Sequence, residues 1–136
     1  MIDFGLPDYP RSTARLAPSR PVVLCLSGHD PSGGAGLQAD IEALLAQGCH
    51  AAPAVTALTV QDTVNVTDFR VLDRDWVLAQ AHAVIADMPV AAVKLGMLGS
   101  VEMVDTVMMI MDKLPGVPLV CCLLYTSDAA DDSLRV

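Results

Sequence analysis

Short apolar runs alternate with longer amphipathic segments along this sequence, and that alternation constrains the fold more than any other feature. Residues 21–28, PVVLCLSG, are almost continuously apolar, which is typical of a strand buried on both faces of a parallel sheet. Residues 36–48 follow, and Gly48 stands where a helix C-terminus would be capped. Apolar residues keep helical spacing in this segment at Leu37, Ile41, Leu44 and Leu45. A strand followed by a helix is therefore predicted.

The same alternation continues toward residue 120. Apolar runs predict further strands at residues 50–61, 64–72 and 90–98 and from residue 117. Helices are predicted at residues 74–88 and 101–114, with Asp73 and Ser100 as N-caps. We expect Pro53 to delay the start of its strand and Trp76 to face the core. This order predicts an α/β fold: a mainly parallel sheet flanked by helices, with ligands at the carboxyl ends of the strands.

Composition excludes several classes of function. The 136 residues suit one domain, with 53% hydrophobic and 18% charged residues. The net charge of −8 and the lack of a basic cluster argue against nucleic acid as a partner. The four cysteines form no CxxC pair, which predicts no zinc site and favours a reduced, cytoplasmic protein. No secretory signal or membrane-spanning run is present, so no membrane partner is expected.

A glycine-rich loop, SGHDPSGGAG at residues 27–36, joins the first strand to the first helix. A phosphate-binding P-loop needs GxxxxGK followed by Ser or Thr. Gly28 and Gly33 have that spacing, but Gly34 stands where the lysine is required, and GxGxxG is absent as well. Two interpretations remain: a tight turn, or a loop whose backbone and Asp30 contact a ligand other than through a P-loop.

Three polar residues lie at or near the predicted carboxyl ends of the strands. Asp40 is one turn into the first helix, where a carboxylate is favourable whatever its function. Gln61 follows a buried strand and suits the edge of a heterocycle, or an exposed turn. Lys94 interrupts an apolar strand, so it either pairs with a carboxylate or faces the site. The isolated histidines receive no metal-binding or catalytic role.

Three stretches taken together resemble the hydroxymethylpyrimidine/phosphomethylpyrimidine kinases of thiamine biosynthesis, in the ribokinase-like superfamily. They are LSGHDPSGGAGLQADIEALLAQG, VTALTVQDT and AVKLGMLGS, and the resemblance runs from Val22 to Val120. It implies an incomplete ribokinase-like fold and ATP- and Mg²⁺-dependent phosphorylation of 4-amino-5-hydroxymethyl-2-methylpyrimidine and then of its monophosphate. Two alternatives stay open: a pyridoxal or pyridoxine kinase of the same superfamily, and a non-catalytic pyrimidine-binding module.

The resemblance also implies a substrate-binding set. Gly28 would place backbone against the pyrimidine ring, and the backbone at Thr59 would line the pocket. Asp40 and Gln61 would hydrogen-bond the aminopyrimidine, and Met97 would pack on it. Members of the family usually have Gln-Asn where this chain has Gln-Asp at residues 61–62.

The chain is about half the usual length for the family, and the resemblance divides it into three parts. Residues 1–20 are expected to be a loose leader, and residues 21–121 the N-terminal part of the kinase domain. The expected PLVCDPV breaks after Cys121, and residues 122–136 resemble one reading frame of a sequencing adapter, so we expect a non-native read-through tail. ATP, Mg²⁺ and the catalytic residues would belong to the absent half. The chain is thus expected to be inactive, with homodimer formation left to the full-length protein.

Overall fold

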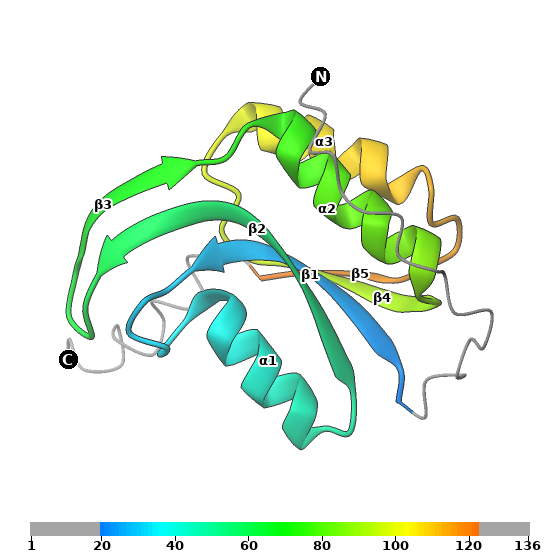
Figure 1. Ribbon diagram of the computed structural model, residues 1–136, viewed down its shortest axis with the longest axis horizontal. Coiled ribbons are helices and arrows are strands. Elements are labelled where there is room, and N and C mark those ends of the chain that lie inside the picture. The colour runs from blue at the N-terminus through cyan, green and yellow to red at the C-terminus, as the bar shows by residue number, and fades with distance from the viewer. Residues whose placement is uncertain (1–19, 123–136) are drawn as a thin grey trace, which may run out of the picture.

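The computed structural model describes residues 20–122, so the predicted leader and tail lie outside it except for Arg20 and Cys122. The described residues form five strands and three helices (Figure 1). In chain order these are β1 (Val22–His29), α1 (Gly36–Ala46), β2 (His50–Gln61), β3 (Val66–Val71), α2 (Arg74–Asp87), β4 (Val90–Leu95), α3 (Val101–Met111) and β5 (Leu119–Cys121). The predicted order of elements is confirmed.

The strands form one sheet in the order β3-β2-β1-β4-β5. β1 lies at its centre and pairs in parallel with β2 and β4, while β5 pairs in parallel with β4. β3 alone is antiparallel, paired with the second half of β2. The β2–β3 hairpin reaches beyond the end of β1 (Figure 1). The mainly parallel sheet predicted from the alternation is therefore present.

Helix α1 covers one face of the sheet, and α2 and α3 cover the other (Figure 1). Side chains of β1 point alternately to the two faces, as they must in a strand. Leu24 and Leu26 join the core under α2 and α3, and Val23 and Cys25 join a smaller core with Leu37 of α1. The continuous apolar run thus reflects a strand that is buried on both faces.

Some local predictions were wrong. β2 begins at His50, before Pro53, because β3 pairs only with residues 57–61 and leaves the β2 edge beside the proline unpaired. Trp76 is 43% exposed, because it lies about 100° around α2 from the buried Val77. Asp73 occupies the N-cap position of α2, but its side chain makes no capping hydrogen bond.

Other predictions about helix ends are confirmed. The Ser100 hydroxyl accepts a hydrogen bond from the Met103 backbone N–H at 3.2 Å. Gly48 follows the C-cap of α1 with φ +73°, a conformation that favours glycine. None of the helices in the described part of the chain has the length and apolarity that a bilayer crossing requires.

Candidate functional site

The predicted site residues gather at the edge of the sheet where β1, β2 and β4 end. Gly28 is buried in β1, and a Cβ added to it would lie 3.6 Å from the Met97 sulfur. Met97 comes after Gly96 in the loop that follows β4, and its carbonyl oxygen accepts a hydrogen bond from the buried Thr56 hydroxyl of β2. The backbone N–H of Gly96 donates to the Leu26 carbonyl at 2.8 Å. The loop after β4 is therefore fixed to β1 and to β2 beside Gly28.

Thr59 and Gln61 form a second part of this edge. The Thr59 hydroxyl donates to the backbone carbonyl of His29 at 2.8 Å, which ties β2 to the end of β1. The side-chain amide of Gln61 donates to the same hydroxyl oxygen at 2.7 Å. That hydrogen bond sets the orientation of the Gln61 amide and leaves its carbonyl oxygen to accept from a ligand. Gln61 therefore lies in an ordered chain of hydrogen bonds and not in a free turn.

Asp62 belongs to the hairpin turn. One of its carboxylate oxygens accepts hydrogen bonds from the backbone N–H groups of Val64 and Asn65, both at 2.8 Å. These bonds lower the pKa of the carboxyl group. The exposed Asp62 thus has a structural use in the turn.

Asp40 of α1 forms an ion pair with Lys94 of β4. The Lys94 ammonium lies 2.7 Å from one carboxylate oxygen of Asp40 and 2.8 Å from the other. This ion pair joins α1 to β4, and only 13% of the Asp40 side chain and 23% of the Lys94 side chain are exposed. Of the two roles left open for Lys94, pairing with a carboxylate is confirmed. The predicted substrate-binding set omitted this lysine, although its place in an apolar strand was a signal.

Cys25 lies beside Lys94 in the pairing of β1 with β4. Its side chain is fully buried, as its apolar surroundings in the sequence predicted. Burial first, and then the negative charge of Asp40, raise the pKa of the Cys25 thiol to about 11, although Lys94 opposes the change. The thiol is therefore a packing group and not a nucleophile at neutral pH.

The glycine-rich loop is organised around Asp30, which is 2% exposed. Its carboxylate accepts hydrogen bonds from the Ser32 backbone N–H at 2.8 Å, the Ser32 hydroxyl at 3.0 Å and the Ala35 backbone N–H at 2.8 Å. Burial opposes ionisation, but these bonds and one from Gly34 outweigh it and lower the pKa of Asp30. At Gly36, φ is +59° and a Cβ would collide with the Gly28 carbonyl oxygen. This loop is a tight, internally bonded turn that lets α1 begin close to Gly28.

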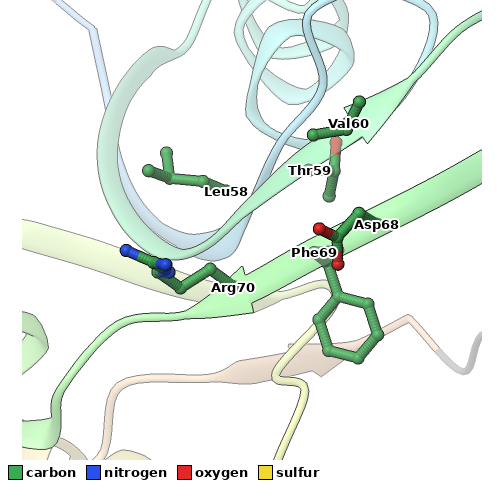
Figure 2. A pocket seen from close by; sticks show the side chains of 6 residues that line it. All are labelled: Leu58, Thr59, Val60, Asp68, Phe69 and Arg70. Carbon is green, nitrogen blue, oxygen red and sulfur yellow. The ribbon is translucent and has the colours of Figure 1, made fainter.

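A hollow of about 270 Å³ lies on the β2–β3 hairpin (Figure 2). It is lined by Leu58, Thr59, Val60, Asp68, Phe69 and Arg70. Thr59 is the one member of the predicted substrate-binding set that lines it. The hollow therefore belongs to the β2–β3 hairpin, and neither Gly28 nor Met97 lines it. Within residues 20–122, no group of three or more His, Cys, Asp or Glu residues is arranged to hold a metal ion.

Comparisons with known proteins identify the family of the chain. The sequence profile of the family described as phosphomethylpyrimidine kinase matches residues 30–132. The hydroxymethylpyrimidine/phosphomethylpyrimidine kinase of Mycobacterium tuberculosis is 47% identical over 87 residues, which cover 64% of this chain and 32% of that protein. The thiamine biosynthesis multifunctional protein ThiED of Corynebacterium glutamicum is 43% identical over 91 residues, covering 67% of this chain and 12% of that protein.

Solved structures give the same result. The phosphomethylpyrimidine kinase of Clostridium difficile superposes with a TM-score of 0.71 at 34% identity, over 75% of this chain and 44% of that one. An ADP complex of Bacillus subtilis pyridoxal kinase superposes with a TM-score of 0.67 at 26% identity, over 75% of this chain and 41% of that one. These neighbours confirm the ribokinase-like fold. The chain belongs to the phosphomethylpyrimidine kinase family, and it spans about a third of the length of the curated hydroxymethylpyrimidine kinase that it matches.

Proposed function

We propose that the chain forms the acceptor-binding part of a kinase that phosphorylates 4-amino-5-hydroxymethyl-2-methylpyrimidine and then its monophosphate in thiamine biosynthesis. The observation that carries the proposal is the gathering of Gly28, Gln61 and Met97 at one edge of the sheet, next to Asp40. The family match supports an aminopyrimidine as the class of substrate.

The chemistry of these groups suits an aminopyrimidine. The ring would lie against the Gly28 backbone with the Met97 thioether packed on it, because no side chain at Gly28 separates that backbone from Met97. The exocyclic amine is a donor and the ring nitrogen beside it is an acceptor. Gln61 offers an amide that can match both, and the Asp40 carboxylate accepts from an N–H group. The Thr59 backbone would close the pocket on the β2 side.

ATP is the phosphoryl donor that the family implies. Solved neighbours carry nucleotides: the B. subtilis pyridoxal kinase holds ADP, and a Staphylococcus aureus pyridoxal kinase holds AMP-PCP. We propose that ATP and Mg²⁺ bind to the part of the family domain that this chain does not match, where positioning and electrostatic stabilisation drive phosphoryl transfer. The chain alone should therefore not turn over ATP. A cytoplasmic location and a homodimer of the whole kinase are part of the same proposal.

The proposal is tested by titrating the 136-residue chain with 4-amino-5-hydroxymethyl-2-methylpyrimidine and following amide shifts by NMR. We expect shifts at Gly28, Gln61 and Met97. Gln61→Leu should weaken binding roughly tenfold, since a buried polar contact is lost. Gln47→Leu, at the exposed C-terminal end of α1, is the matched control and should bind normally. Shifts confined to other faces, or robust ATP turnover by the chain alone, would contradict the proposal.

A pyridoxal or pyridoxine kinase is the second candidate. The observation that favours it is the similarity to solved pyridoxal kinases, at TM-scores of 0.67 and 26–27% identity. Titration with pyridoxine under the same conditions separates the two. A lower dissociation constant for the aminopyrimidine supports the first assignment, and a lower one for pyridoxine would replace it with the second.

A further inference from the structure

The ion pair between Lys94 and Asp40 lies at the proposed acceptor site, and the predicted substrate-binding set included Asp40 but not Lys94. Its two residues are 54 positions apart in the sequence and come from β4 and α1. Both side chains are largely shielded from water. A charge so placed is costly unless it is paired, so each residue of the pair depends on the other.

The geometry of the contact restricts the Asp40 carboxylate. Both of its oxygens lie within 2.8 Å of the Lys94 ammonium, which therefore bisects the carboxylate. Each carboxylate oxygen retains a further lone pair for a donor elsewhere. The ammonium lies beside Gly96, because a Cβ added to that glycine would lie only 3.1 Å from it. Lys94 thus holds Asp40 in one orientation next to the residue that precedes Met97.

We propose that Lys94 is a positioning residue of the acceptor site, which holds the Asp40 carboxylate oriented to accept a hydrogen bond from the amino group of the ligand. Lys94 does not touch the ligand in this arrangement and acts through Asp40. The inference rests on the proposed function, because it assigns this carboxylate to recognition of an amine. A pair that only joins α1 to β4 would stabilise the fold without affecting which ligand is preferred.

Ligand preference therefore tests the inference. The chain is titrated with 4-amino-5-hydroxymethyl-2-methylpyrimidine and with the analogue that carries a carbonyl oxygen in place of the amine, at one fixed pH. The unsubstituted chain should prefer the amine. Lys94→Met should lower that preference roughly tenfold, the effect of weakening one hydrogen bond to a charged acceptor. Asp40→Asn should lower it similarly, and the double variant should lose little more, since the two residues act as one unit.

Three further variants complete the design. Lys94→Arg retains the charge and the donors, so it should keep the preference within about threefold of the unsubstituted chain. Lys113→Met makes the same substitution at an exposed lysine after α3 and should leave the preference unchanged. If Lys94→Met does not fold by circular dichroism, Lys94→Gln, with a single neutral amide donor, takes its place.

The outcomes separate the inference from the proposed function. Loss of preference in the neutral Lys94 variant, with recovery in Lys94→Arg, supports the inference. Equal weakening of both ligands would reduce the pair to a structural contact and overturn the inference, while the pyrimidine site would stand. Failure of the unsubstituted chain to bind either ligand would contradict the proposed site, and the inference with it.

Discussion

Gly96 occupies a position where even one methyl group has no room, and Gly96→Ala is the sharpest test of how the site is packed. A Cβ at this position would collide with the Ser27 hydroxyl oxygen and would lie 2.8 Å from the Ser27 Cβ and 3.1 Å from the Lys94 ammonium. Ser27 is 1% exposed within the central strand, so it cannot move aside cheaply. The ammonium is the end of a flexible side chain and can adjust. The conflict is therefore between Gly96 and Ser27.

The magnitude follows from the cost of overpacking a rigid interior. Forcing extra atoms into a close-packed site costs about 1–3 kcal/mol. For a domain of this size each kcal/mol lowers the melting temperature by roughly 4–8 °C. We therefore expect Gly96→Ala to lower the melting temperature by about 5–20 °C. Because Gly96 adjoins Lys94 and Met97, affinity for the pyrimidine should fall as well.

Circular dichroism measures the melting temperature on heating and the free energy of unfolding in urea. Two further variants make the test more specific. Ser27→Gly removes both atoms that meet the new methyl group, so the double variant should recover at least about 1 kcal/mol relative to the sum of the single changes. Gly28→Ala is the matched control: its Cβ would meet no atom closer than 3.6 Å. It should change stability by less than about 0.5 kcal/mol, although it places a methyl group at the proposed ring-binding surface. An unchanged unfolding midpoint for Gly96→Ala, or additive effects with Ser27→Gly, would refute the reasoning.

Two further predictions concern buried titratable groups. Burial raises the pKa of Cys25 to about 11, so this thiol should resist iodoacetamide at pH 8 while the exposed Cys121 and Cys122 react. Mass spectrometry of the alkylated peptides measures the difference. Labelling of native Cys25 at the same rate as Cys121 and Cys122 would contradict its burial. The folded pKa of Asp30 is lowered below the ordinary value of 3.8, so its contribution to stability is complete above about pH 4 and is lost as pH falls through the folded pKa. Asp30→Asn should therefore flatten the acid side of the stability profile measured by urea unfolding, and a profile of unchanged slope would contradict the role of its hydrogen bonds.

The elements of the fold could be predicted because their signals are local. Burial of β1 on both faces requires a continuous apolar run, and residues 22–28 supply it. The predictions that were wrong depend on contacts with residues elsewhere in the sequence. Whether Pro53 interrupts a strand depends on which edge of β2 remains unpaired, and whether Trp76 is buried depends on how α2 lies against the sheet. Neither is encoded in the residues around these positions.

The site shows the same division between local and distant information. Parallel strands end at one edge of the sheet, so the sequence could predict that residues following β1, β2 and β4 would meet there. It could not select the partner of Lys94, because several carboxylates were available and the one chosen lies 54 residues away in α1. The hydrogen bond from Thr59 to His29 likewise depends on the register of β1 with β2. The partners of these side chains could therefore be identified only from the structure.

The glycine-rich loop illustrates why a motif that resembles a phosphate cradle need not be one. A phosphate loop binds through backbone N–H groups that have no partner in the protein. Here the N–H groups of Ser32 and Ala35 already donate to the buried carboxylate of Asp30. The loop thus contains its own anion, and an incoming phosphate would have to displace a charged group that is stabilised in place. The glycines instead allow the close approach of Gly36 to the Gly28 carbonyl, which places the start of α1, and Asp40 one turn later, beside the proposed acceptor site.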